Sequence, residues 1–136
     1  MIAIVCLDEQ NGMAFNLRRQ SKDRVVIEDI LKESERSLLY LNEYSYGLFK
    51  DFEVSHIKVS ETYLDEAEKG SYCFVENKSL SSYIQKIEQI VVYRWNRRYP
   101  ADVYLGIELN SGWKKVSTSD FTGFSHECIT KEIYVK

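Results

Sequence analysis

The sequence predicts a single α/β domain: a three-layer sandwich whose mixed, mostly parallel sheet ends in an antiparallel C-terminal hairpin. Ile2–Leu7 is a continuous apolar run, typical of a strand buried on both faces by covering helices. Short apolar runs then alternate with segments of helical spacing, which implies parallel pairing through right-handed crossovers. Two long strand-like segments, 113–121 and 127–136, are joined around Gly123 and predict the hairpin.

Composition bounds the remaining possibilities. A chain of 136 residues is expected to form one domain, 1–136, with a sizeable core. The net charge of −3 gives no overall positive field for nucleic acid or membrane. No positive residue precedes the N-terminal apolar run, so we expect a strand and a cytoplasmic protein rather than a signal peptide. Three widely spaced cysteines fit a reducing compartment, and all three (Cys6, Cys73 and Cys128) are expected to be small buried hydrophobes.

The N-terminal third is expected to border a cleft. After the first strand, Asn11-Gly12 breaks the pattern and an apolar loop, 11–16, follows. Ser21 is then the expected N-cap of a helix, with Asp23 in its first turn. The apolar positions of that helix share one face and are Val26, Ile27, Ile30 and Leu31. It should end at 34–37.

The middle of the chain predicts shorter elements. Asn42 is the expected cap of a helix over 43–50, and Ser79 that of a helix over 80–87. Residues 63–69 are expected to be a loop or one helical turn. Alternation over 103–109 predicts a strand, followed by a turn at 110–112. The remaining predicted strands are 38–41, 54–59, 72–75 and 89–95.

The two ends of the chain carry a family resemblance. Met13-Ala14-Phe15-Asn16-Leu17 is similar to the Met-Pro-Trp-Asn-Leu of dihydrofolate reductases, and the preceding strand and loop resemble that family's strand and mobile substrate loop. Trp113, Ser125-His126 and Ile133-Tyr134 resemble the family's C-terminal strands. The resemblance implies the fold and, in principle, an NADPH-dependent reductase.

The catalytic positions depart from the family's pattern. The proton-relaying carboxylate of the family falls on Gln20 here, and an amide cannot exchange a proton in the useful pH range. Asp23 is a possible replacement one turn later. The threonine that supports the acid falls on Tyr93. The catalytic candidates are therefore Gln20, Asp23 and Tyr93.

The cofactor positions depart as well. The family's phosphate-binding Gly-Arg-x-Thr falls on Asn42-Glu43-Tyr44-Ser45, where Glu43 would repel a phosphate. The Gly-Gly pair that admits the pyrophosphate falls on Glu76-Asn77, whose side chains would block the approach. We therefore expect no bound NADPH and no other cofactor.

A second resemblance is to short bacterial proteins often labelled ribonuclease Z. That nuclease needs clustered histidines and aspartates around two metals. Only His56 and His126 are present, far apart in sequence and without a Cys-x-x-Cys pair, so no metal site is expected. Ser125-His126-Glu127 resembles a catalytic grouping in composition only, because neighbours on a strand point to opposite faces.

Two basic clusters leave alternatives open. Residues 18–24 place four positive charges beside the apolar loop, either to hold an anion or as a solvated helix start with Arg24 paired to Glu28. Residues 94–98 (Arg-Trp-Asn-Arg-Arg), with Tyr93 and Tyr99 on either side, interleave aromatics with arginines, as RNA binders do. Such an RNA interface would use both clusters.

The leading hypothesis is a non-reductase member of the fold, a pseudoenzyme. It would bind a small anionic or nucleotide-like ligand, or a protein partner, in a cleft beside the 11–16 loop. Arg18 and Arg19 would supply charge, and Met13, Phe15 and Tyr93 apolar walls. A reductase that uses Asp23 and an RNA-binding protein are the alternatives. The candidate ligand-binding residues are Asn11, Met13, Phe15, Arg18, Arg19, Asn42, Ser45, Glu76 and Asn77.

Overall fold

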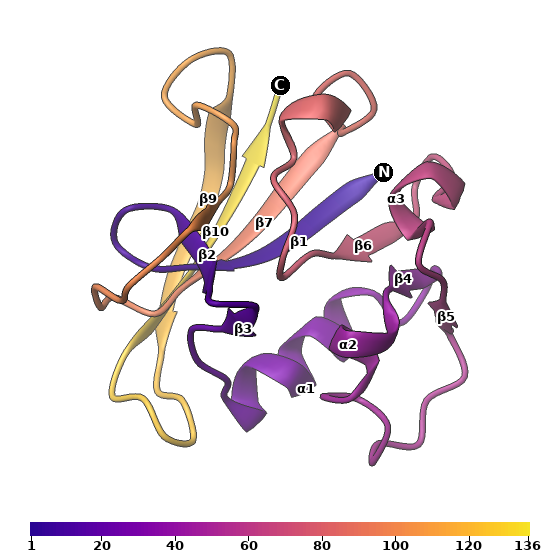
Figure 1. Ribbon diagram of the computed structural model, residues 1–136, viewed down its shortest axis with the longest axis horizontal. Helices are drawn as coiled ribbons and strands as arrows, with labels where there is room; N and C mark the ends of the chain where they lie inside the picture. The colour runs from indigo at the N-terminus through magenta and orange to yellow at the C-terminus, as the bar shows by residue number, and fades with distance from the viewer.

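The computed structural model describes residues 1–136 and places the first strand at the middle of the main sheet. Its seven strands have the order β5-β4-β6-β1-β7-β10-β9 (Figure 1). The predicted mixed α/β architecture is confirmed. The strands of this sheet are β1 (Ile2–Leu7), β4 (Leu39–Leu41), β5 (Ile57–Val59), β6 (Tyr72–Phe74), β7 (Gln89–Arg94), β9 (Lys114–Phe121) and β10 (Ile129–Val135).

Strand direction divides the sheet in two. β1 lies parallel to both β6 and β7, and β4 is parallel to β5 and β6. β10 is antiparallel to β7 and to β9, which confirms the C-terminal hairpin. The parallel register brings Leu7 opposite Arg94, so the segments that follow β1 and β7 leave the sheet at the same edge. Ligands of open α/β sheets bind at this carboxyl edge.

Helices are few and short. They are α1 (Arg24–Glu33), α2 (Glu43–Tyr46) and α3 (Tyr63–Glu66). Asn42 caps α2 as predicted, since its side chain accepts from Ser45 N. The predicted cap of α1 is wrong, because Asp23 and not Ser21 occupies that position and accepts from Val25 N. Ser21 Oγ instead forms a hydrogen bond with His126 Nε2 (2.8 Å).

Two predicted elements are wrong. Residues 80–87 form one 3₁₀ turn, Ser81–Tyr83, instead of a helix. The strand over 103–109 is limited to β8 (Val103–Tyr104), because Gly106 has a positive φ of 78° that interrupts the extended backbone. Both segments nevertheless bury apolar side chains, which is what the periodicity reported; the buried ones are Leu80, Ile87, Leu105, Ile107 and Leu109.

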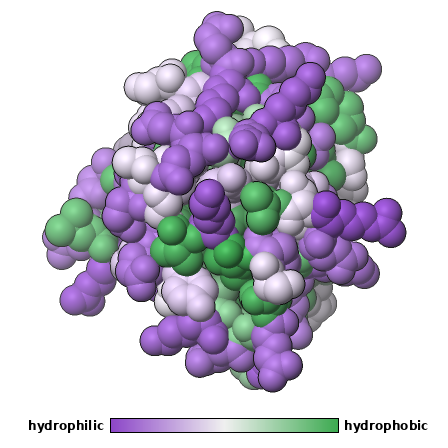
Figure 2. All heavy atoms as spheres, turned by 90° about the vertical axis from the view of Figure 1, so that its right-hand side faces the viewer, coloured by the Kyte–Doolittle hydropathy of each residue, from purple (hydrophilic) through white to green (hydrophobic).

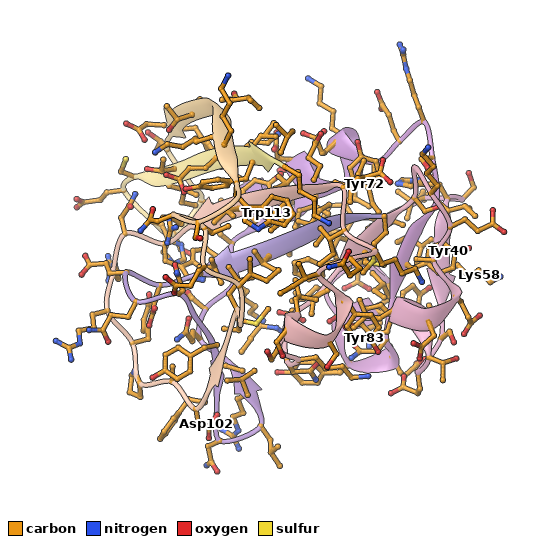
Figure 3. The ribbon with its side chains drawn as sticks, turned by 90° about the horizontal axis from the view of Figure 1, so that it is seen from above. Tyr40, Lys58, Tyr72, Tyr83, Asp102 and Trp113 are labelled. Carbon is orange, nitrogen blue, oxygen red and sulfur yellow. The ribbon has the colours of Figure 1, made fainter.

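The 11–16 segment is a strand rather than a loop. β2 (Gly12–Phe15) pairs with β3 (Arg18–Arg19) and with β8 in a second, three-stranded sheet. Asn16 and Leu17 join β2 to β3, both at positive φ (52° and 64°), as a two-residue type I′ hairpin turn requires. Asp102 accepts a hydrogen bond from Asn16 N (3.1 Å) and lies at the lower edge of the molecule in Figure 3.

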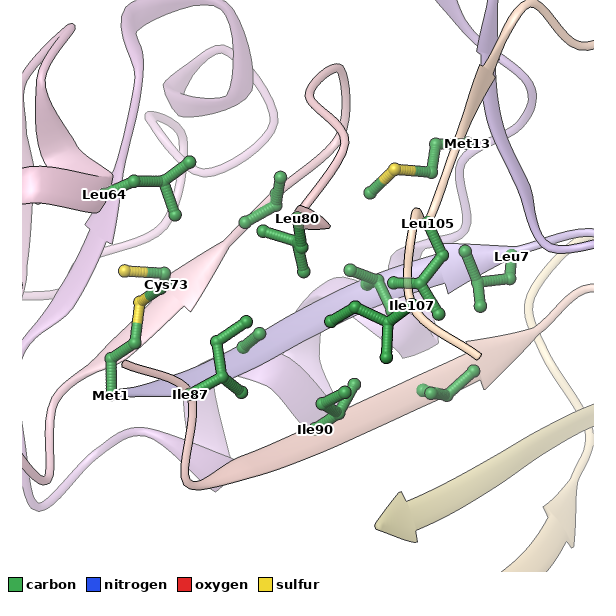
Figure 4. Close-up of a cluster of buried hydrophobic side chains, with 14 of the residues drawn as sticks. Met1, Leu7, Met13, Leu64, Cys73, Leu80, Ile87, Ile90, Leu105 and Ile107 are labelled. Carbon is green, nitrogen blue, oxygen red and sulfur yellow. The ribbon is translucent and has the colours of Figure 1, made fainter. Parts of the chain in front are cut away.

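Apolar side chains cover the main sheet on both faces. Alternate residues of β1 point to opposite sides: Val5 and Leu7 belong to one core cluster, and Ile4 belongs to the other. The first cluster includes Leu80, Leu105 and Ile107 from the irregular segments (Figure 4). The second is closed by α1 and Phe49. These two cores account for the three layers.

The surface is largely polar. The face over β5 and α3 is mostly hydrophilic with a small hydrophobic group near its centre (Figure 2). On this side the Lys58 ammonium lies 5.6 Å from the centroid of the Tyr40 ring. The three cysteines are free: Cys73 is buried as expected, Cys6 is only partly buried, and Cys128 is exposed, so the expectation that all three are buried is wrong for Cys128. None of the helices is long and apolar enough to cross a membrane.

Candidate functional site

Asp8 organises the carboxyl edge of β1. This carboxylate is buried (1% exposed), and its Oδ1 accepts from the backbone N–H groups of Gln10 and Gly12, both at 2.8 Å. Its Oδ2 accepts from Gln20 Nε2 at 3.0 Å and from Tyr99 N at 3.3 Å. One side chain thus ties together the turn after β1, the segment before α1 and the segment after β7.

Gln20 is left with an orphaned acceptor. Its Nε2 donates to Asp8 and also to Pro100 O (3.3 Å), which fixes the amide orientation. Its Oε1 is buried and has no hydrogen-bond partner. A buried polar atom without a partner in the protein is uncommon in folded proteins; the Tyr63 hydroxyl is another one in this chain.

The orphaned amide belongs to a hollow of about 310 Å³ at the β2–β3 hairpin. The exposed Phe15 supplies an apolar wall, and Arg18 supplies a charge that makes no ion pair. The volume lies at the lower end of the range for small-molecule sites. We call this feature the Gln20 hollow; its lining residues are Phe15, Asn16, Arg18, Arg19, Gln20, Tyr99 and Pro100.

Two predicted walls of the cleft lie elsewhere. Met13 is 3% exposed and packs in the first core cluster (Figure 4). Tyr93 is fully buried in the second cluster, where its hydroxyl donates to Asp29 Oδ2 (2.6 Å). Burial, then Asp29, raises the pKa of Tyr93 far above its usual range. Neither residue lines the hollow. Asn11 accepts from Arg94 Nη1 (2.8 Å) and so holds the turn.

The start of α2 is occupied by the protein's own acceptors. Asn42 Oδ1 accepts from Ser45 N, and Glu61 Oε2 accepts from Glu43 N, both at 2.9 Å. Ser45 Oγ donates to Glu76 Oε1 (2.8 Å). Asn77 accepts from the Asn42 amide at 3.2 Å. The backbone donors that a helix start offers to an anion are therefore partly consumed.

Arg19 completes this arrangement. Its Nε and Nη2 donate to the two carboxylate oxygens of Glu76 at 2.7 and 3.1 Å, a bidentate pair. Glu76 is 7% exposed. Partial burial disfavours the charged form of Arg19, but the Glu76 carboxylate outweighs it and raises the pKa of Arg19. The guanidinium also lies 4.4 Å from the Tyr44 ring centroid. Arg19 is thus committed to an internal anion.

Asp23 is surrounded by donors. Its carboxylate accepts from Phe124 N and Ser125 N, both at 2.9 Å, and from His126 Nδ1 at 2.8 Å. Burial opposes its ionisation, yet these hydrogen bonds prevail and hold the pKa of Asp23 well below its usual range. The three catalytic candidates are therefore not brought together: Gln20 lies in the hollow, Asp23 under the β9–β10 connection and Tyr93 against α1.

Sequence reasoning missed Asp8 and the role of His126, and it placed Tyr99 only beside the 94–98 basic cluster. Asp8 directly follows a predicted central strand, so the rule that sites gather at carboxyl edges could have found it. His126 was considered with its sequence neighbours only, whereas its partners Ser21 and Asp23 lie over a hundred residues earlier in the chain. No sequence signal reports that pairing.

The basic clusters are partly neutralised. Arg94 forms an ion pair with Glu132 at 2.7 Å, and Arg19 with Glu76, while no ion pair joins Arg24 to Glu28. Arg98 lies in a shallow depression that shares Tyr99 and Pro100 with the Gln20 hollow. No group of three or more His, Cys, Asp or Glu side chains is arranged to hold a metal ion.

Comparison with known proteins supports the fold alone. No family model and no curated protein sequence matches the chain. Among solved structures, a dihydrofolate reductase from Enterococcus faecalis, complexed with NADP(H) and RAB-propyl, superposes with a TM-score of 0.69. The match covers 98% of this chain and 94% of that one, at 13% identity. The chain has a dihydrofolate-reductase-like fold, as predicted. The ribonuclease Z resemblance stays a prediction.

Proposed function

We propose that the protein is a non-reductase member of this fold that binds a small, nucleotide-like ligand in the Gln20 hollow. The ligand would carry a flat heterocycle with an N–H donor and an anionic group. The observation that carries the proposal is the buried, unpartnered Oε1 of Gln20. A ligand N–H would satisfy it, and this recovers a desolvation penalty of about 1–3 kcal/mol.

The rest of the hollow fits the same ligand class. Phe15 and Tyr99 offer aromatic surface to a heterocycle. Arg18 is exposed and makes no ion pair, so it remains free to meet an anion, whereas Arg19 is held by Glu76. Asp8 accepts a hydrogen bond from Gln20 Nε2 and so holds the Gln20 amide in place. The site therefore needs little reorganisation when a ligand binds.

The residues at the start of α2 disfavour reduction that depends on NADPH. The Enterococcus faecalis structure contains NADP(H). Here Glu76 brings a buried carboxylate to the start of α2, where the family resemblance places a phosphate-binding helix end. Like charges in a partly buried site repel strongly. Asp23 makes a poor displaced acid, because its lowered pKa keeps it ionised and unable to donate a proton.

Ligand binding can be tested by thermal shift against nucleoside monophosphates and pterins. A ligand specific for the folded state raises the melting temperature by mass action. We expect a concentration-dependent rise that is lost in Gln20→Leu and weakened in Arg18→Ala. Arg36→Ala, on the exposed surface after α1, is the matched charge control. A rise that survives Gln20→Leu, or no rise with any member of the panel, would reject the proposal.

RNA binding is the second candidate, because Arg18 and Arg98 line two hollows that share Tyr99 and Pro100. It predicts a gel shift whose affinity falls steeply with salt. A protein partner at the exposed Phe15 and Leu17 would instead leave the Gln20 variant unaffected.

A further inference from the structure

Ser21, His126 and Asp23 form a continuous hydrogen-bonded line. Ser21 Oγ lies 2.8 Å from His126 Nε2, and His126 Nδ1 lies 2.8 Å from Asp23 Oδ2. An ionised carboxylate can only accept, so Nδ1 carries the proton and Nε2 accepts from the Ser21 hydroxyl. These are the distances and roles of a nucleophile, its base and the group that orients the base.

The base is held firmly. Trp95 stacks on the His126 ring, with centroids 4.6 Å apart and planes 27° apart. His126 is 7% exposed and Asp23 3%. Ser21 itself is half-buried, so it is not enclosed in the core as Ser34 is. A fixed imidazole beside a reachable hydroxyl is the arrangement that nucleophilic catalysis needs.

We propose that Ser21 is the nucleophile of a second, hydrolytic site that cleaves small acyl esters, with His126 as base and Asp23 as its positioning residue. Ser21 Oγ bonds to the ester carbon while its proton passes to His126 Nε2. The carbon–oxygen bond to the alcohol breaks, and the alcohol leaves with that proton. Water then attacks the acyl-serine, giving its proton to Nε2, and the freed Ser21 oxygen recovers that proton. The products are a carboxylic acid and an alcohol.

Space and an oxyanion donor lie beside this line. A cavity of about 580 Å³ is lined by Asp23, by Lys22, which follows Ser21 in sequence, and by Ser125, which precedes His126. Its apolar walls suit a short acyl chain and come from Ile27, Leu48, Phe52 and Phe124. The backbone N–H of Lys22 has no acceptor in the protein. The amide after a nucleophilic serine is a common oxyanion donor.

The chain contains its own negative control. Ser34 Oγ lies 3.0 Å from His56 Nε2, but Ser34 is fully buried and its hydroxyl donates to Ile30 O. No carboxylate is hydrogen-bonded to His56. This second serine–histidine pair should be unreactive, so it separates a mere hydrogen bond from an activated nucleophile.

The test is labelling with a fluorescent fluorophosphonate, with the modified residue mapped by mass spectrometry, and p-nitrophenyl acetate hydrolysis as a second readout. We expect one adduct, on Ser21, and none in Ser21→Ala. His126→Gln should slow labelling by roughly 100-fold or more. Asp23→Asn should slow it too, while asparagine still caps α1. Ser34→Ala should label like the wild type.

Circular dichroism and melting temperature establish that each variant is folded. If folded wild-type protein takes up no label, or if labelling persists in Ser21→Ala or is unaffected by His126→Gln, the proposal is rejected and the three residues only clasp the β9–β10 connection to α1. Neither result bears on the Gln20 hollow, which thermal shift tests separately.

Discussion

Two regions at the carboxyl edge of the sheet, the start of α2 and the β2–β3 hairpin, differ in how their polar groups are satisfied. At the start of α2, Glu76 is saturated by Arg19 and Ser45, and the helix amides meet Asn42 and Glu61. At the β2–β3 hairpin, Gln20 retains a buried acceptor without a donor. The donors near α2 already meet the Glu76 carboxylate, whereas the Gln20 Oε1 acceptor meets no donor of the protein.

Under the proposed function, this difference separates a ligand-binding region at the hairpin from a self-stabilised region at the start of α2. A carboxylate from the protein satisfies the same donors that a phosphate would, and it does so without any loss of translational entropy. The Gln20 hollow has no such internal substitute. We therefore propose the hairpin as the ligand-binding region, and we expect the Arg19–Glu76 ion pair at the start of α2 to stabilise the fold.

The largest expected effect is at Glu76. Glu76→Ala leaves Arg19, 21% exposed, without its bidentate partner and should lower the free energy of unfolding by about 3 kcal/mol. Urea denaturation measures this. Glu68 is an exposed carboxylate without a side-chain hydrogen bond or ion pair, so Glu68→Ala should change stability by less than about 0.5 kcal/mol. Equal effects for the two variants would mean that the α2 end is not held by this pair.

Gly12 tests how tightly the hairpin end is built. A Cβ at this position would lie 2.6 Å from Ala101 Cβ and 2.8 Å from Gln20 Nε2. Gly12→Ala should therefore destabilise by about 2 kcal/mol and displace the Gln20 amide, weakening ligand binding as well. Gly70→Ala has open space but a positive φ, so it reports backbone strain without crowding. If the Gly12→Ala variant bound the ligand normally, ligand binding in the hollow would not depend on the position of the Gln20 amide.

The pH dependence of stability tests Asp23. Because its pKa is lower in the folded protein than the ordinary 3.8, its contribution is complete above that pH and is lost as the pH falls through the folded-state value. The wild type should lose about 1–2 kcal/mol more than Asp23→Asn on acidification from neutral pH to below pH 3.8. If the wild type and Asp23→Asn lost the same free energy of unfolding on acidification, ionised Asp23 would not contribute to stability.

Leu17 gives the smallest effect, and with the opposite sign. It is 92% exposed at a φ of 64°, a backbone conformation that leucine tolerates poorly. Leu17→Gly should stabilise the hairpin by about 0.5–1 kcal/mol, since Asn-Gly suits a type I′ turn. Thermal unfolding measures the gain. A loss of stability would show instead that the leucine side chain contributes contacts.

Local patterns predicted much of the fold. The apolar run of β1 and the apolar spacing of α1 identified buried faces, and the predicted cap of α2 was right, whereas that of α1 was wrong. The same signal misplaced 80–87 and 103–109, because periodicity reports which side chains are buried and not whether the backbone is regular. For the site, sequence identified Gln20 and Glu76 through family positions. It could not foresee that Arg19 would meet Glu76, or that His126 would meet Ser21, since such contacts depend on tertiary structure.

The most direct test of the central claim is a titration of the wild-type protein with NADPH, followed by quenching of Trp95 and Trp113 fluorescence. Because the Glu76 carboxylate and its partners occupy the start of α2, we predict no saturable response. Inner-filter correction with free tryptophan serves as the control. Saturable quenching at micromolar NADPH would contradict the account, because it would show that a dinucleotide binds despite the internal anion.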